Sequence, residues 1–219
     1  MLRFGDEFNS EGEHELSVNP HRCNPRRYNE ALEFALHAHD GQFRKGSDTP
    51  YITHPVAVSA ILAQYGYGED LVIAGLLHDV LEDTPVTQDE LEKRFGEDIA
   101  SLVRGVTEEK KDARGLPRAW EIRKENALWH VGLAEEQVVA LKAADALHNV
   151  DCLIRDLRIA GDDIWNRFKR GREQQLDYYR RLSTVILERL GEAPLVLELY
   201  QAVEILENPV LGVRVKRQL

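Results

Sequence analysis

Residues 70–84 read DLVIAGLLHDVLEDT, and this stretch determines what kind of fold the chain can form. Its first part is apolar on nearly every side, which is typical of a helix buried at the centre of a protein. The pattern predicts a helix over 70–81 that ends in a group of ionisable side chains. Because such a helix needs other helices to cover it, the flanking sequence should be amphipathic.

Amphipathic helices are indeed predicted on both sides of this central segment. From Arg27 onwards, apolar residues recur at three- and four-residue spacing. A second helix begins at His54-Pro55, where a proline in the first turn loses no hydrogen bond. Thr87 and Glu90 form a capping box for a short fourth helix. Further helices are expected over 96–105, 118–131, 134–158, 173–190 and 193–206.

These patterns favour an all-α fold, a single helical domain of about eight to ten helices. We find no strand-like alternation longer than about four residues and no internal repeat. We expect the domain to cover residues 26–207. Residues 1–25, which are acidic and weakly periodic, are expected to form a flexible extension, and residues 208–219 a basic tail.

Composition narrows the range of partners. The chain has 219 residues, 43% of them hydrophobic, and a net charge of −10. A chain of this length buries roughly 70% of its unfolded surface, so it needs no disulfide or metal merely to fold. The acidic balance disfavours binding to duplex nucleic acid. It still allows an anionic small molecule to bind, provided that basic groups are concentrated locally.

Cysteine usage and hydropathy predict a cytoplasmic protein without a membrane partner. Cys23 and Cys152 are too few for a disulfide framework and are expected to be free thiols in a reducing compartment. No apolar run reaches the roughly 18 residues of a membrane span. The N-terminus lacks the pattern of a signal peptide. Nothing in the sequence indicates an oligomeric state.

The strongest chemical signal is the group His78, Asp79, Glu82 and Asp83. Their spacing puts them on adjoining faces of one helical turn. Crowded carboxylates repel one another, and a divalent cation relieves that repulsion. The alternative is a helix end with solvated acids and a capping histidine. The pattern is not the zinc-protease HExxH motif, because no histidine lies four residues after His78.

Two further segments carry polar groups at suitable spacing. Lys142, Asp145 and Asn149 share one face of a long helix, although a Lys with an Asp three residues later is often only a surface ion pair. His54 stands at a helix start, where a histidine is often a cap or a core side chain. Taken together with the central segment, these residues suggest a site of mixed nitrogen and oxygen ligands. Such a set suits Mn, Fe or Zn better than Ca or Mg, and its members would be His54, His78, Asp79 and Asp145.

The order of these residues resembles that of the HD-domain metal-dependent phosphohydrolases. The HD pair alone is a weak signal, but longer motifs occur in the same order. In particular the chain resembles the hydrolase domain of the RelA/SpoT homologues in its free-standing form, the small alarmone hydrolases, over roughly residues 28–182. The motifs are Ala38-His39-x-Gly41-Gln42-x-Arg44-Lys45, Pro50-Tyr51-Ile52-x-His54-Pro55, Leu76-Leu77-His78-Asp79-Val80-x-Glu82-Asp83-Thr84, Val106-Thr107 and Leu141-Lys142-x-Ala144-Asp145-x-x-His148-Asn149.

The resemblance implies Mn²⁺-dependent removal of the 3′-pyrophosphate from (p)ppGpp, giving GDP or GTP and pyrophosphate. It implies His54, His78, Asp79 and Asp145 as metal ligands. Glu82 and Asp83 match the acidic pair that orients and deprotonates the attacking water. The matching substrate-binding positions are Arg44, Lys45, Lys142 and Asn149.

Some positions depart from the family pattern and leave other functions open. Ala146 stands where relatives often have a basic residue, and the segment 165–179 resembles only a subset of the small hydrolases. Trp165, Phe168 and Tyr178 are candidates to stack on a purine or to belong to the core. Six basic residues between 164 and 182 form either a phosphate-binding patch or a solvated helix face. The alternatives to a (p)ppGpp hydrolase are an enzyme for another nucleotide, such as the adenosine alarmone ppApp, and a non-catalytic nucleotide-binding module.

Overall fold

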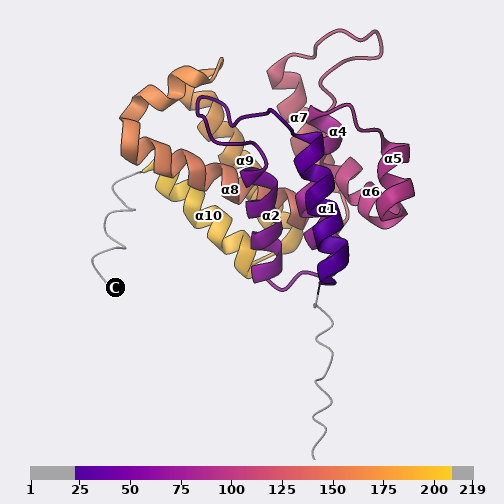
Figure 1. Cartoon of the computed structure of the whole chain (residues 1–219). Helices are drawn as coiled ribbons and strands as arrows, with labels where there is room; N and C mark the ends of the chain where they lie inside the picture. Colours follow the sequence, from indigo (N-terminus) through magenta and orange to yellow (C-terminus); the bar gives the residue numbers. More distant parts are fainter. Residues whose placement is uncertain (1–22, 209–219) are drawn as a thin grey trace, which may run out of the picture.

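The computed structural model describes residues 23–208, and within this range the chain is built from helices (Figure 1). Two isolated antiparallel bridges, Phe43 with Pro50 and Lys111 with Pro117, are the extended pairings of the described part. The all-α prediction is therefore confirmed there. The helices are α1 Pro25–Ala38, α2 Thr53–Gln64, α3 Glu69–Leu77, α4 Val80–Asp83, α5 Gln88–Phe95, α6 Glu97–Val106, α7 Trp120–Leu133, α8 Glu136–Ala160, the 3₁₀ helix η1 Gly161–Arg167, α9 Gly171–Leu190 and α10 Pro194–Glu207.

The first helix begins at Pro25 and the last ends at Glu207, so the helices span the predicted domain range 26–207, with the two longest loops at 39–52 and 107–119. Residues 1–22 of the predicted extension and 209–219 of the predicted tail lie outside the described residues. None of the helices in the described part is long and apolar enough to cross a membrane. Cys23 and Cys152 are both free, as expected.

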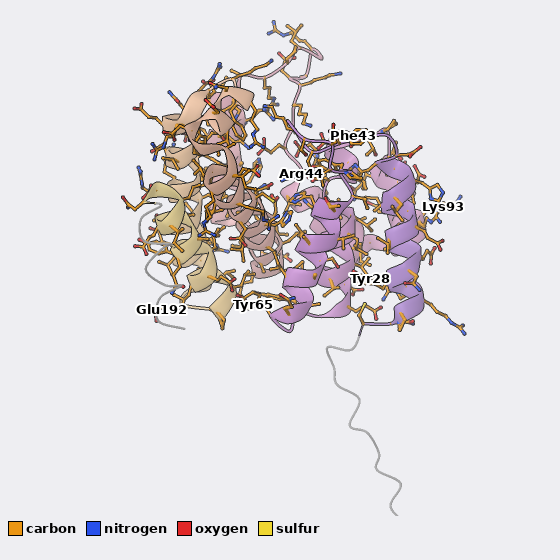
Figure 2. The ribbon with its side chains drawn as sticks, turned by 60° about the vertical axis from the view of Figure 1, so that its left-hand side comes forward. Tyr28, Phe43, Arg44, Tyr65, Lys93 and Glu192 are labelled. Atoms are coloured by element: carbon orange, nitrogen blue, oxygen red, sulfur yellow. The ribbon has the colours of Figure 1, made fainter. Side chains whose placement is uncertain are left out.

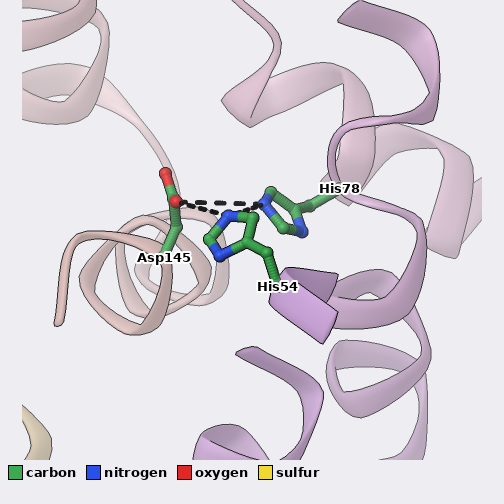
Figure 3. A group of neighbouring side chains, drawn as sticks. All are labelled: His54, His78 and Asp145. Carbon is green, nitrogen blue, oxygen red and sulfur yellow. Dashed lines mark hydrogen bonds and ion pairs between the residues drawn. The ribbon is translucent and has the colours of Figure 1, made fainter. Parts of the chain in front are cut away.

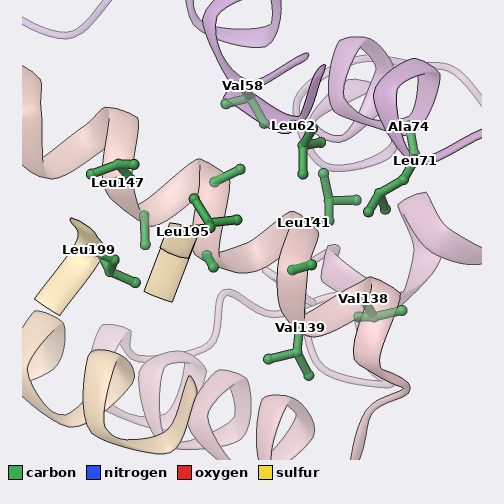
Figure 4. Close-up of a cluster of buried hydrophobic side chains, with 14 of the residues drawn as sticks. Val58, Leu62, Leu71, Ala74, Val138, Val139, Leu141, Leu147, Leu195 and Leu199 are labelled. Atoms are coloured by element: carbon green, nitrogen blue, oxygen red, sulfur yellow. The ribbon is translucent and has the colours of Figure 1, made fainter. Parts of the chain in front are cut away.

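Helix α3 lies at the centre of the fold, as its composition predicts. Every residue from 71 to 77 is buried, and α3 contacts α1, α2, α6 and α8. On the other side of the molecule α10 packs across α8 and α9. The side chains between these helices form one continuous apolar core (Figure 4). Two layers of helices thus meet along α8, which runs through the middle of the molecule.

Helices α2 and α3 approach each other unusually closely at Gly75. A Cβ atom added there would lie 2.9 Å from the Cα atom of Ser59, which is closer than packed atoms allow. The Ser59 hydroxyl donates a hydrogen bond of 2.8 Å to the carbonyl of Val72 and ties the two helices together. Because His54 is on α2 and His78 directly follows α3, this close contact sets the separation of the two histidines.

The single helix predicted over 70–81 is wrong in one respect, because the structure interrupts it at His78 and Asp79. Helix α3 ends at Leu77, and the short helix α4 begins at Val80. The His78 ring lies with Nδ1 2.9 Å from the carbonyl of Gly75, the acceptor that a continuing helix would use for residue 79. The break separates His78 and Asp79 from regular helix geometry. The 3₁₀ helix η1 was also not predicted, since α8 ends at Gly161 with φ 62° and the chain continues in a tighter turn.

Candidate metal centre

Three separate parts of the chain bring imidazole and carboxylate groups to one point. His54 comes from the first turn of α2, His78 from the α3–α4 junction and Asp145 from the middle of α8 (Figure 3). The Nε2 atom of His54 lies 3.2 Å from Nε2 of His78 and 3.2 Å from Oδ1 of Asp145. One ligand atom from each of these residues falls within 4.8 Å of the others. His54 and His78 are 1% and 3% exposed, so their ring nitrogens depend on one another and on the nearby acids.

Asp79, the fourth predicted ligand, lies beside the same point. Its Oδ2 atom is 3.0 Å from Nε2 of His78 and 3.5 Å from Nε2 of His54. The hydroxyl of Tyr51 donates a hydrogen bond of 2.6 Å to this oxygen. Tyr51 has no predicted role, although it lies three residues before His54 in the Pro50-Tyr51-Ile52-x-His54-Pro55 motif, and this position is a usable signal.

The electrostatics of the cluster fit a divalent cation. Burial lowers the pKa of His78, but the Asp79 carboxylate outweighs that effect and raises it to about 9. Burial raises the pKa of Asp79, yet His78 and His54 bring it below its ordinary range. In the protein chain by itself a proton therefore balances the carboxylates. Two imidazole nitrogens and two carboxylates are ligands that a transition-metal ion binds. Such an ion can replace that proton and balance the carboxylates.

Asp145 is held in place by two neighbours on its own helix. Lys142 Nζ lies 2.9 Å from Asp145 Oδ2, and the amide of Asn149 donates to Oδ1 at 2.6 Å. The Lys142 side chain is only 12% exposed, so the alternative of a surface ion pair is wrong. The Arg44 guanidinium in turn donates to the Asn149 side-chain oxygen at 2.8 Å. The face that the spacing predicted exists, with Asp145 buried and Lys142 and Asn149 partly buried beside it.

The acidic pair Glu82 and Asp83 follows Asp79 on α4. Lys110, from the loop between α6 and α7, contacts both acids, lying 3.3 Å from Glu82 Oε1. The Glu108 backbone N–H donates to Glu82 Oε2 at 3.0 Å. Burial raises the pKa of Glu82, and the nearby Glu108 and Asp79 carboxylates act in the same direction. A carboxylate with a raised pKa next to a candidate metal centre is suited to accept a proton. Lys110 was missed, and its position three residues after the Val106-Thr107 motif was the available signal.

A cleft of about 420 Å³ lies beside the cluster, lined mainly by basic and aromatic side chains. Arg44 and Lys45 enter it from the loop between α1 and α2, where Figure 2 labels Arg44. Asp156 is the one acidic residue in the lining, and it pairs with Arg167 at 2.8 Å. The cleft is therefore a positively charged site in a protein of negative net charge. The remaining lining residues are Ser47, Thr49, Tyr51, Thr53, His148, Asn149, Cys152, Leu153, Arg155, Phe168 and Tyr179.

The structure separates the aromatic candidates. Trp165 and Tyr178 are 6% and 5% exposed and belong to the core, whereas Phe168 lines the cleft. The Lys45 ammonium lies 5.1 Å from the centroid of the Phe168 ring. Tyr179, which sequence reasoning passed over, lines the cleft too.

The basic residues between 164 and 182 do not form one phosphate-binding patch. Most of them pair with acids on the surface, and of the six only Arg167 lines the cleft. The solvated-face interpretation is therefore nearer to what the structure contains. The ion pairs are Arg170–Glu121, Arg172–Asp162, Arg180–Glu207 and Arg181–Glu125.

A helical domain in which two histidines and two aspartates surround one point has the donor set of a helical metal-dependent enzyme. The chain belongs to the HD domain family, whose model matches residues 31–175.

Relatives within and beyond bacteria are similar to this chain. A guanosine-3′,5′-bis(diphosphate) 3′-pyrophosphohydrolase of Haemophilus influenzae is 42% identical over 121 residues, 54% of this chain and 17% of that protein. A probable enzyme of the same name from Synechocystis is 33% identical over 191 residues, 77% of this chain and 25% of that protein. The chain thus spans a quarter or less of the length of these relatives.

A solved structure of similar size also matches. It is described as a metazoan ortholog of SpoT that hydrolyzes ppGpp and plays a role in starvation responses. Its TM-score is 0.68 at 29% identity, and the match covers 84% of this chain and 97% of that one. A Listeria monocytogenes protein matches with a TM-score of 0.62 at 32% identity, over 71% of this chain and 94% of that chain.

Proposed function

We propose that this protein removes the 3′-pyrophosphate of (p)ppGpp by hydrolysis, giving GDP or GTP and pyrophosphate. One observation carries the proposal: the His–Asp cluster lies beside both a half-buried acid, Glu82, and a basic cleft. Water activation, phosphorus polarisation and anion binding are thereby available around one point. The named activities of the relatives in bacteria and metazoa support the same substrate.

The proposed metal is manganese, held by His54, His78, Asp79 and Asp145. When bound, such an ion supplies positive charge that polarises the phosphate and makes water more acidic. The nitrogen and oxygen donors favour Mn²⁺ over Ca²⁺ or Mg²⁺ by ligand type. Tyr51 and Lys142 keep the two aspartates in position through their contacts with Asp79 and Asp145.

The chain's own residues perform the proton and charge chemistry. Water attacks the phosphorus that is bonded to the ribose 3′ oxygen, and that phosphorus–oxygen bond breaks. Glu82 accepts one proton of the water, and the ribose 3′ oxygen leaves as a hydroxyl after taking a proton from solvent water. The raised pKa of Glu82 brings its basicity nearer to neutral pH, where proton transfer is most useful. Asp83, which shares Lys110 with Glu82, helps to orient the water.

The basic cleft is proposed to hold the nucleotide. Arg44 offers a planar fork for phosphate oxygens, and Lys45 adds a point charge. Phe168 and Tyr179 supply aromatic surface for the base or ribose. A cytoplasmic location and the absence of membrane or duplex nucleic-acid partners belong to the same proposal, and the free cysteines support the location.

The test is product analysis by ion-exchange chromatography after incubation with ppGpp or ppApp in the presence of Mn²⁺. We expect GDP and pyrophosphate from ppGpp. Turnover of ppApp alone would favour the adenosine alarmone, and binding of ppGpp without any product would favour a non-catalytic module.

The Glu82→Gln variant tests the proton acceptor. Because the amide cannot take a proton, turnover should fall by about 10²–10⁴-fold while Mn²⁺ content is retained. Glu188→Gln, on the exposed surface of α9, is the matched control and should keep full activity. Unchanged turnover in Glu82→Gln would remove Glu82 from the mechanism.

A further inference from the structure

His54 uses both of its ring nitrogens. Its Nε2 atom faces the metal cluster, while its Nδ1 atom lies 2.6 Å from Nδ1 of His148. His148 is on α8, one helical turn after Asp145, and its own Nε2 atom lies 3.6 Å from Sγ of Cys152. The three side chains form a line that leads from the cluster into the wall of the basic cleft.

The two imidazoles meet edge to edge. Their centroids are 4.9 Å apart, and their planes differ by 27°. With a nitrogen–nitrogen distance of 2.6 Å, these values describe rings that lie almost in one plane with their Nδ1 atoms pointing at each other. A stacked pair would instead bring the ring faces together. The contact is therefore a hydrogen bond along the ring edges, which requires one proton between the two nitrogens.

Only one arrangement of protons satisfies both histidines when His54 binds a metal. A ligating Nε2 carries no proton, so the single proton of neutral His54 is on Nδ1. His148 must then accept at Nδ1 and carry its own proton on Nε2, directed at the Cys152 sulfur. His78 follows the same rule by a different route, because its Nδ1 atom faces the Gly75 carbonyl. Each candidate histidine ligand thus has one fixed acceptor behind it.

We propose that His148 is a positioning residue for the metal centre, which fixes the tautomer and ring orientation of His54 through its Nδ1 atom. Metal-binding histidines usually donate their second N–H to a carboxylate, a carbonyl or water. Here a neutral imidazole from the nucleotide cleft takes that place. The inference rests on the proposed function in one respect, that His54 binds a metal ion.

The first experiment measures the Mn²⁺ dissociation constant by competition with a fluorescent chelator, without nucleotide. His148→Phe keeps a ring of similar shape but has no acceptor, so the affinity should fall by about 10–100-fold. His148→Asn places an amide oxygen near the lost nitrogen and should recover most of that affinity. His130→Phe, on the exposed face of α7, is the control and should bind Mn²⁺ like the wild type. Equal affinities of His148→Phe and the wild type would overturn the proposal.

The second experiment keeps the proposal testable even if His148→Phe does not fold. Nitrogen-15 NMR of the wild-type histidine rings, with diamagnetic Zn²⁺ bound, reports which nitrogen carries each proton. We expect the proton of His54 on Nδ1 and that of His148 on Nε2. A proton on Nδ1 of His148 would contradict the proposal. Neither readout uses ppGpp, so the two proposals can fail independently. If both tests give the expected result but ppGpp is not hydrolysed, only the proposed function is refuted.

Discussion

At the scale of single residues, the site depends on buried charges that have partners. Asp145 contacts Lys142 through one oxygen and His54 and Asn149 through the other. Burial opposes the charge of Lys142, but Asp145 more than compensates and holds the pKa of the lysine well above its usual range. An isolated buried charge would be costly, so each member keeps the others ionised.

Glu108, at the edge of the site, is likewise a largely buried charge with partners of opposite charge. Its side chain is 8% exposed and pairs with Arg123 at 3.1 Å and Lys124 at 2.6 Å. Burial raises its pKa, but Lys124, Lys142 and Arg123 outweigh burial and leave the pKa below its ordinary value. Glu108→Gln should therefore destabilise the protein by about 1–3 kcal/mol at neutral pH, less than for a fully buried pair because the partners are partly hydrated.

The pH dependence of this effect has a definite sign. The folded state favours the ionised form, so the stabilisation is complete above the unfolded pKa of about 4.3 and is lost as the pH falls through the lower folded value. Urea unfolding of the wild type and of Glu108→Gln between pH 7 and pH 3 measures this effect. The difference between their free energies of unfolding should become smaller as the pH falls. Glu109→Gln, whose side chain is 53% exposed, is the control and should stay within about 0.5 kcal/mol of the wild type. A difference that grows toward acid would contradict this account.

At the scale of helices, the close approach of α2 and α3 determines where the two histidines lie. Adding a methyl group in Gly75→Ala brings Cβ within 2.9 Å of Ser59 Cα and 3.0 Å of Leu62 Cδ1. The backbone must move, which should cost about 1–3 kcal/mol and weaken Mn²⁺ binding as His54 and His78 separate. The urea midpoint and a chelator competition measure the two effects.

Gly132→Ala is the matched control for this change, since Gly132 also lies within a helix. A Cβ atom there would lie 3.9 Å from Val185 Cγ1, an ordinary contact. Alanine favours helix over glycine by up to about 1 kcal/mol, so this variant should be neutral or more stable. Equal destabilisation of both variants would show that helix separation is not the cause.

At the scale of the whole molecule, the candidate metal centre links parts of the chain that are far apart in sequence. His54, His78 and Asp145 come from α2, the α3–α4 junction and α8. An ion that binds only the assembled cluster stabilises the entire fold by mass action, about 2.7 kcal/mol at a hundred times its dissociation constant. Adding Mn²⁺ should raise the Tm by several degrees, and EDTA should reverse the shift.

The same thermal scan on two aspartate variants shows whether the shift comes from this site. Asp145→Asn should lose the response to Mn²⁺, whereas Asp163→Asn, on the exposed turn of η1, should keep it. A full Mn²⁺ response in Asp145→Asn would place the stabilising ion elsewhere.

The sequence by itself determined the helices and the order of the site residues. Apolar periodicity is a local property, so it indicated α1, α2 and α8 to within a few residues, and the composition of 71–77 identified the central helix. The gathering of His54, His78, Asp79 and Asp145 at one point was also predictable, because their order matches that of the family that the sequence resembles, and their role as metal ligands stays a prediction. The geometry of Asp79, at the break between α3 and α4, could not be predicted from the sequence, because the break depends on the contact between the His78 ring and the Gly75 carbonyl.

Only the tertiary structure decided which charges are paired and which side chains reach the cleft. Lys110, in the loop between α6 and α7, contacts Glu82 of α4, and His148 of α8 contacts His54 of α2. Arg181 of α9 is paired with Glu125 of α7. Trp165 is in the core while Phe168, three residues later, lines the cleft. These outcomes depend on contacts between segments distant in sequence. Local spacing contains no information about such contacts, because they are fixed by how the helices pack against one another.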